Sequence, residues 1–165
     1  MYNNRYAIVA LVPEPFREQL GAMRKQYDIF CRQWLPPHVT IVPPFDLALT
    51  RDEKQLLKQI SVPTTASFEG WGAYQRKFTS VIFQKMPDHS FDDMKIAAYD
   101  AVPMLPPQPV DDPTYHVTVV SRIPNEQFEP LKAEVEKHEV QGSFTVDRVT
   151  VYSWDDNVRQ WLEVT

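Results

Sequence analysis

The chain has 165 residues, of which 43% are hydrophobic, and this length is typical of one compact domain with a single core. The formal net charge of −5 argues against an extended nucleic-acid groove, because backbone binding needs clustered lysine and arginine, whereas a terminal phosphate needs only a local site. The single cysteine, Cys31, excludes a disulfide within the chain and a cysteine-based zinc cluster, and no apolar run is long enough for a membrane span, so we expect a cytoplasmic protein.

The spacing of apolar residues predicts alternating strands and helices. The predicted strands cover residues 6–12, 38–42, 65–74, 78–83, 115–120, 143–152 and 160–164. The predicted helices cover residues 16–27, 50–60, 90–102 and 125–138. The order is therefore βαβαββαβαββ, in which two similar halves follow one another. Two lobes, each a small sheet backed by helices, would leave a cleft between their strands.

Three of the predicted helices begin near a residue that can cap a helix. Thr50 and Glu53 have the spacing of a capping box, in which each side chain accepts a hydrogen bond from the other residue's backbone. Ser90 and Asn125 are single N-cap candidates for the next two helices. We therefore expect helices to start at these three positions.

The two halves share one tripeptide. His38-Val39-Thr40 opens one predicted strand and His116-Val117-Thr118 opens another, with the histidines 116 − 38 = 78 residues apart. Side chains two apart in a strand point to the same face, so each motif projects an imidazole and a hydroxyl together while its valine packs behind. A single strand histidine is usually a packing residue. Two matched copies in corresponding places favour a shared functional site.

Imidazole and hydroxyl pairs suit phosphoryl chemistry. Imidazole titrates near neutral pH, so one histidine can accept a proton while the other donates one. Thr40 and Thr118 can donate hydrogen bonds to the non-bridging phosphate oxygens. The four glycines form no phosphate-binding loop, so side chains must hold the phosphate. This scheme requires neither a metal nor a cofactor.

The duplicated His-x-Thr motif, followed each time by hydrophobic residues, resembles that of the two-histidine (2H) phosphoesterase superfamily, which includes 2'-5' RNA ligase-like proteins and cyclic phosphodiesterases. The resemblance covers nearly the whole chain. It implies a single α+β domain over residues 1–165, built of two intertwined pseudo-symmetric lobes whose small, antiparallel-rich sheets line a central cleft, with helices outside. It leaves the oligomeric state open.

The resemblance also implies an activity and residue roles. It implies hydrolysis of 2',3'-cyclic phosphates to 2'-phosphates, or chemistry on 2'-5' linkages, in a small nucleotide or an RNA terminus. By position, His38 corresponds to the general acid and His116 to the general base. Arg122, just beyond the second motif strand, resembles an arginine found there in the family and is the candidate cation for the phosphate.

Several other residues have both a structural and a functional interpretation. Arg76 and Lys77 could close the cleft, but charged residues of a solvated turn are the favoured interpretation. Three aromatic residues could stack on a base, but packing in the core is favoured for each; they are Phe45, Trp71 and Tyr74. His89 and His138 lie in polar surroundings and are expected to be structural or solvent-exposed.

Three alternatives remain open: a zinc site, a non-catalytic binding module, and a structural or partner-binding protein in which the motif strands merely pack. A zinc site needs at least a third ligand beside the histidines, for which Asp111 and Asp112 are the available candidates. Alternatively, the cleft is a non-catalytic module that binds nucleotides or RNA ends, although intact histidines and threonines in both motifs count against it.

Overall fold

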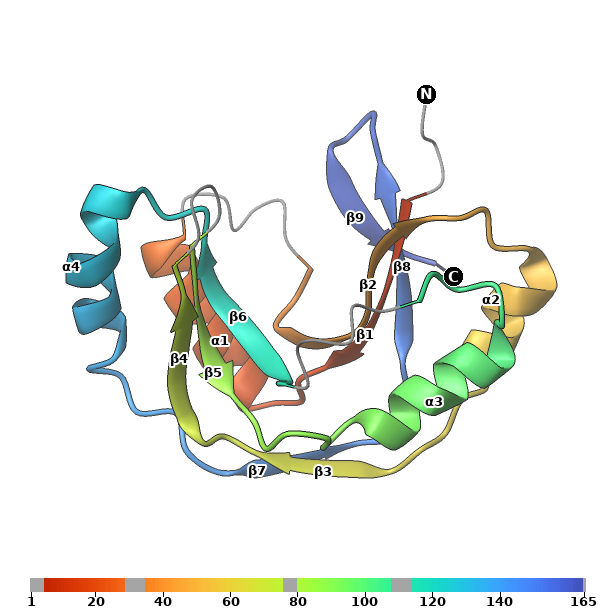
Figure 1. Ribbon diagram of the computed structural model, residues 1–165, viewed down its shortest axis with the longest axis horizontal. Helices are drawn as coiled ribbons and strands as arrows, with labels where there is room; N and C mark the ends of the chain where they lie inside the picture. Colours follow the sequence, from red (N-terminus) through yellow and green to blue (C-terminus); the bar gives the residue numbers. More distant parts are fainter. Residues whose placement is uncertain (1–4, 29–34, 76–79, 108–113, 165) are drawn as a thin grey trace.

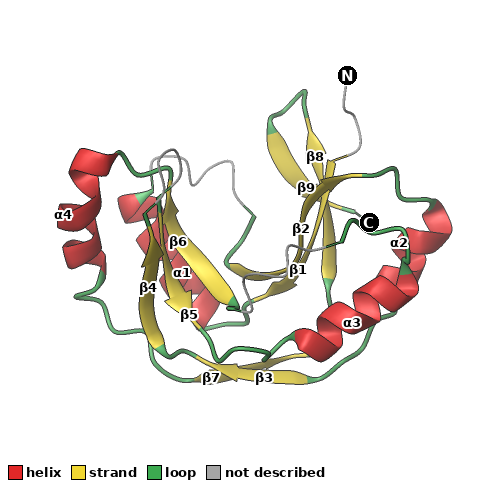
Figure 2. Ribbon diagram, in the orientation of Figure 1, coloured by secondary structure: helices red, strands yellow, loops and turns green. Residues whose placement is uncertain are grey.

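The computed structural model describes residues 5–28, 35–75, 80–107 and 114–164, which form an α+β structure with helices outside small antiparallel sheets (Figures 1 and 2). The strands are β1 Arg5–Leu11, β2 His38–Asp46, β3 Thr64–Ser67, β4 Gly70–Tyr74, β5 Val81–Lys85, β6 His116–Ser121, β7 Ser143–Val146, β8 Thr150–Asp155 and β9 Gln160–Glu163. The helices are α1 Phe16–Tyr27, α2 Arg51–Lys58, α3 Asp92–Ala101 and α4 Asn125–Val135. The predicted α+β class and all four predicted helices are confirmed. Within these ranges no helix has the length and apolar character that a membrane span requires.

The strands form two larger sheets, one in each lobe, joined by a third small one. One lobe holds the sheet ordered β2-β1-β8-β9, and the other holds the sheet ordered β4-β5-β6. Strands β3 and β7 pair with each other along the base that connects the lobes (Figure 1). Helix α1, from the first half of the chain, packs against β6, while α3, from the second half, packs against β2. Each half therefore supplies a helix that supports the motif strand of the other half.

Two of the predicted strands are wrong in extent, because each is divided between two sheets. The predicted strand 65–74 is interrupted after β3, and Gly70 begins β4 with a φ of +111°, a conformation that glycine adopts without a steric penalty. The predicted strand 143–152 is likewise divided into β7 and β8. In both cases the first part joins the connecting sheet and the second part joins a lobe sheet. Alternation of apolar residues reports burial, not which sheet a strand joins.

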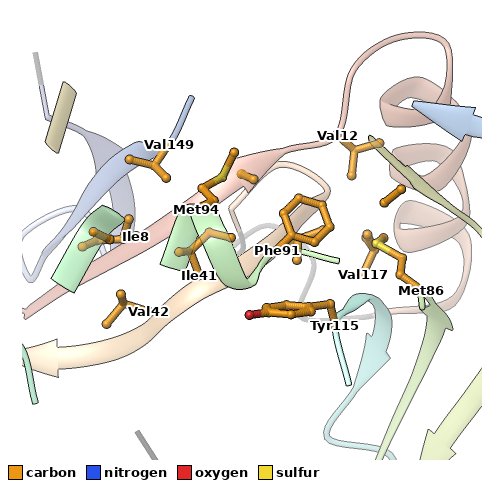
Figure 3. Packing of buried hydrophobic residues seen from close by; sticks show 14 of the residues in the cluster. Ile8, Val12, Ile41, Val42, Met86, Phe91, Met94, Tyr115, Val117 and Val149 are labelled. Carbon is orange, nitrogen blue, oxygen red and sulfur yellow. The ribbon is translucent and has the colours of Figure 1, made fainter. Parts of the chain in front are cut away.

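One apolar core lies behind both motif strands. Ile41 of β2 and Val117 of β6 are completely buried, and Phe91 and Met94 at the start of α3 pack in the same cluster (Figure 3). The cluster continues to Ile8 on the back of β1. Burial of these side chains, each contributing about 1.5–3 kcal/mol, fixes the strands whose other faces carry the motif histidines and threonines.

The capping predictions have mixed outcomes. Thr50 caps α2 through a complete capping box: its backbone N–H donates to Glu53 over 2.7 Å, and the Glu53 N–H donates to its hydroxyl over 3.2 Å. Ser90 is not a cap, because its hydroxyl donates to the Pro87 carbonyl and α3 begins at Asp92. Asn125 is not a cap either, since it is already the first helical residue of α4.

Candidate active site

The two motif histidines are held in the same way by their own chain. His38 and His116 open β2 and β6, and in each case Nδ1 faces the carbonyl oxygen two residues earlier. The distances are 2.7 Å from His38 to Pro36 and 3.3 Å from His116 to Thr114. Because a carbonyl only accepts, Nδ1 is the donor in both rings. A neutral imidazole of this tautomer presents Nε2 as a proton acceptor.

The faces of the motif strands are those that the alternation predicts. Val39 and Val117 are 0% exposed and pack into the core. Thr40 is exposed, and both Thr118 and His38 are half-buried, so these polar side chains lie opposite the core. The packed valines fix the strands and thereby the positions of the polar groups.

A pocket of about 530 Å³ brings the two lobes' motifs together, a volume within the usual range for small-molecule sites. His38 and Thr40 line it from β2, and Thr118 lines it from β6. Arg122, which directly follows β6 and has a φ of +53°, lines it as well. The structure thus places four of the five predicted site residues on one cavity.

His116, the fifth, does not line this pocket but lies near it. Its ring centroid is 4.4 Å from that of Phe83 and 6.1 Å from that of Tyr74. Its charge contributes to the lowered pKa of His38, so the two imidazoles are close enough to interact electrostatically. Of the three predicted stacking aromatics, Tyr74 is therefore the one beside a motif histidine.

Phe83 keeps its place beside His116 because Gly72 has no side chain. Gly72 and Phe83 are opposite each other in the β4–β5 pairing. A Cβ atom added to Gly72 would lie 2.4 Å from Cε2 and 2.7 Å from Cζ of Phe83. The ring therefore occupies the space over Gly72, and the glycine is needed for this close approach.

Two buried charged residues, Arg24 of α1 and Asp28, the C-cap of this helix, anchor the second motif strand from behind. The Arg24 side chain, 4% exposed, donates from Nε to the Thr118 carbonyl over 2.8 Å and from Nη1 to the Leu35 carbonyl over 2.7 Å. Asp28, 3% exposed, accepts a 3.0 Å bond from the Ser121 backbone N–H. Neither residue was predicted to support the site. The signal was present, because Arg24 lies four residues after the buried Leu20, on the apolar stripe of the helix.

Burial and the Arg24 guanidinium lower the pKa of His38 from 6.5 to about 3, and the charge of His116 acts in the same direction. The hydrogen bond to Pro36 opposes this shift but does not cancel it. His38 is therefore neutral at neutral pH in the unliganded protein. With Nδ1 as donor, its Nε2 can accept a proton.

The secondary candidates lie elsewhere. Phe45 is a core residue packed near Tyr6, and the Trp71 indole donates to the His138 carbonyl over 2.9 Å outside this pocket. His138 bonds the Tyr27 hydroxyl, and the exposed His89 pairs with Asp92. Four further candidates fall outside the described residues: Arg76, Lys77, Asp111 and Asp112.

The rest of the pocket wall was not predicted. Trp154 of β8 and Trp161 of β9 face each other across a hairpin and both line the cavity, together with Arg159 and Arg5. Two tryptophans flanking a polar turn were a detectable signal for an aromatic surface. Within the described ranges, no cluster of three or more histidine, cysteine, aspartate or glutamate side chains could hold a metal ion.

Comparisons with known proteins agree with this architecture. The Escherichia coli LigT structure with 3'-AMP aligns over 100% of this chain and 96% of its own, with a TM-score of 0.63 and 12% identity. TT0787 of Thermus thermophilus aligns over 97% and 93%, with a TM-score of 0.53 and 14% identity. Kluyveromyces marxianus Usb1 aligns over 90% and 93%, with a TM-score of 0.51 and 12% identity. At these identities the likeness establishes the fold.

Family membership rests on the sequence itself. Among curated proteins no significant match was found. A family model described as the 2'-5' RNA ligase superfamily matches residues 12–158, which include both His-Val-Thr motifs. Membership in this superfamily supports phosphoesterase activity in general. The chain therefore belongs to the 2'-5' RNA ligase superfamily of two-histidine phosphoesterases.

Proposed function

We propose that this protein hydrolyses RNA-type 2',3'-cyclic phosphates to 2'-phosphates, or the related 2'-5' phosphodiester linkages, without a metal, using His38 and His116 as the acid–base pair. The observation that carries the proposal is the matched orientation of the two imidazoles. Each Nδ1 donates to a carbonyl of its own chain, so each ring presents Nε2 for proton transfer. Thr40 and Thr118, each two residues after a motif histidine, line the pocket.

The proposed reaction needs two proton transfers. A neutral imidazole accepts a proton from water as the water oxygen bonds to phosphorus, and a protonated imidazole donates to the 3'-oxygen as its bond to phosphorus breaks. The product is a 2'-phosphate with a free 3'-hydroxyl. Thr40 and Thr118 donate hydrogen bonds to the non-bridging oxygens, and Arg122 balances their charge.

The assignment of acid and base can be proposed from the surroundings of His38. The family resemblance implies His38 as the acid and His116 as the base. Burial, together with the Arg24 guanidinium, opposes protonation of His38, so its imidazole is neutral in the unliganded protein. We therefore propose the reverse order for hydrolysis, in which His38 accepts the proton from water and His116 protonates the leaving oxygen.

The nucleotide substrate class is consistent with what related structures hold. The LigT structures include complexes with 3'-AMP and with NADP+, and a Usb1 structure contains uridine monophosphate. A mononucleotide suits a pocket of about 530 Å³ better than a long nucleic acid does.

Turnover of defined substrates in EDTA tests the proposal. The purified protein is incubated with the four nucleoside 2',3'-cyclic monophosphates and with 2'-5'-linked dinucleotides, and the products are resolved by chromatography. His38→Ala and His116→Ala should each lower turnover by about 10²–10⁴-fold. His89→Ala is the matched control, because His89 is exposed and lines no part of the pocket.

Other outcomes would contradict the proposal in distinct ways. Unchanged turnover in both histidine variants would show that the site is elsewhere. Activity that EDTA abolishes and zinc restores would favour the metal site. Tight binding of the nucleotides by the wild type, without product, would favour the non-catalytic binding module.

A further inference from the structure

The far end of the pocket is built from the β8–β9 hairpin. Trp154 and Trp161 are opposite each other in the strand pairing, and their ring centroids are 5.7 Å apart at an interplanar angle of 70°. The Trp154 indole is fixed by a 2.8 Å hydrogen bond from its Nε1 to Asp156 in the turn. Both indoles are only half-buried and both line the cavity. A fixed, half-exposed indole beside a cavity is suited to stacking on a flat, polarisable group such as a nucleobase.

This end of the pocket is also rich in positive charge. Arg5 and Arg159 line it, and Arg122 lines the same cavity from the other lobe. None of its lining residues in the described ranges is an aspartate or a glutamate, although the chain as a whole carries a net charge of −5. The carboxylates of the hairpin turn are used within the hairpin: Asp156 accepts from Trp154, and Asp155 accepts from the Asn157 backbone N–H over 2.8 Å. The pocket therefore has more cationic groups than one phosphate requires.

The hairpin end is separate from the place where the motif threonines would hold a phosphate. Val9 pairs with Thr40, and Arg5 lies four residues further along the same strand, a distance of about 13 Å at roughly 3.3 Å per residue. Between them the pocket floor consists of the small side chains Ala7 and Val9. A ligand can therefore extend along this floor from the threonines towards the hairpin.

We propose that the hairpin end is a second subsite, which binds the nucleoside and a second phosphate of the substrate. Trp154 and Trp161 would provide the stacking surface for the base, while Arg5 and Arg159 would bind a phosphate on O5' of the nucleoside whose cyclic phosphate lies at the motifs. The preferred substrates therefore carry a phosphate on O5' as well as the 2',3'-cyclic phosphate. A free 5'-phosphorylated nucleoside and the end of an RNA strand share this chemistry. The proposal rests on the proposed function of the same site.

Three substrates separate these sources: adenosine 2',3'-cyclic phosphate, its 5'-phosphorylated form, and a diadenosine dinucleotide that ends in the cyclic phosphate. The wild type should favour the two O5'-phosphorylated substrates by about tenfold or more in kcat/KM, chiefly through KM. Arg5→Ala and Arg159→Ala should bring this ratio towards one. Arg148→Ala is the matched control, because this exposed arginine pairs with Asp147 and does not line the pocket, so it should keep the full ratio. A higher kcat/KM for the dinucleotide assigns the subsite to RNA ends, and a higher value for the mononucleotide assigns it to free nucleotides.

Ligand affinities measured by calorimetry test the subsite independently of catalysis. Adenosine 3',5'-bisphosphate should bind the His116→Ala protein at least about tenfold more tightly than adenosine 3'-monophosphate does. Adding Arg159→Ala or Trp161→Leu should weaken binding of the bisphosphate. If no substrate is turned over but this dependence is observed, the proposed hydrolysis fails and the subsite stands. Equal binding of the two ligands, or a ratio that neither arginine variant changes in binding or turnover, overturns the subsite.

Discussion

Replacing Arg24 with methionine should destabilise the protein and raise the pKa of His38. The guanidinium is 4% exposed and donates to two backbone carbonyls, those of Thr118 and Leu35. A hydrogen bond from a charged donor contributes about 1.5–3 kcal/mol, and methionine cannot satisfy either carbonyl, so the free energy of unfolding should fall by about 3–5 kcal/mol. The same substitution removes the positive charge that disfavours protonation of His38.

Urea unfolding and an NMR titration of the His38 ring measure the two effects separately. Arg24→Lys is the informative companion, because it keeps the charge but loses the fork of donors. In that variant the pKa of His38 should stay low while part of the stability is lost. Arg148→Met, at an exposed position, should change neither quantity. A folded Arg24→Met protein whose His38 pKa equals that of the wild type would refute the electrostatic reasoning, and a stability change below about 1 kcal/mol would refute the structural one.

Three further predictions follow from the site. Gly72→Ala should cost about 1–3 kcal/mol in thermal unfolding and lower turnover by displacing the Phe83 ring, and unchanged values for both would contradict the close packing. Because the folded-state pKa of His38 is about 3 against 6.5, the unfolded chain binds more protons between these values, so stability should fall as the pH drops from about 6.5 towards 3. Urea unfolding of His38→Ala should show a smaller loss of stability over this pH range. A loss equal to that of the wild type would assign the pH dependence to other groups. With a nitrophenyl phosphodiester, whose leaving group needs no proton, His116→Ala should retain a larger fraction of wild-type turnover than His38→Ala, and the opposite order would restore the roles implied by the resemblance.

Local patterns were sufficient for the parts of this protein whose causes are local. The alternation in His38-Val39-Thr40 predicts which side chains share a face, and burial of Val39 agrees, because the period of a strand does not depend on its partner. The Thr50 capping box succeeds for the same reason. Ser90 fails as a cap because its hydroxyl is used by the preceding turn, at Pro87, an arrangement that polarity alone does not reveal.

The unpredicted parts depend on contacts between distant segments. Arg24 reaches Thr118 across 94 residues of sequence, and helical periodicity identifies it only as a charge on an apolar stripe. The β8–β9 hairpin, which carries Trp154 and Trp161, reaches the pocket because β8 pairs with β1. This pairing brings the last strands of the chain beside the first. Such pairings follow from tertiary packing, so the sequence indicated the motif pair but not the wall that faces it.

The exchange of helices between the two halves ties the site to the folding of the whole chain. Strand β2 is supported by α3 and strand β6 by α1, so neither half contains both a motif strand and the helix behind it. The Arg24 and Asp28 bonds to Thr118 and Ser121 are the polar part of this support, and the packing of α3 against β2 is the apolar part. A half-chain would keep its His-Val-Thr sequence but lose the element that fixes its face. Both motif strands are therefore supported, and the two imidazoles brought together, only when the two halves pack against each other.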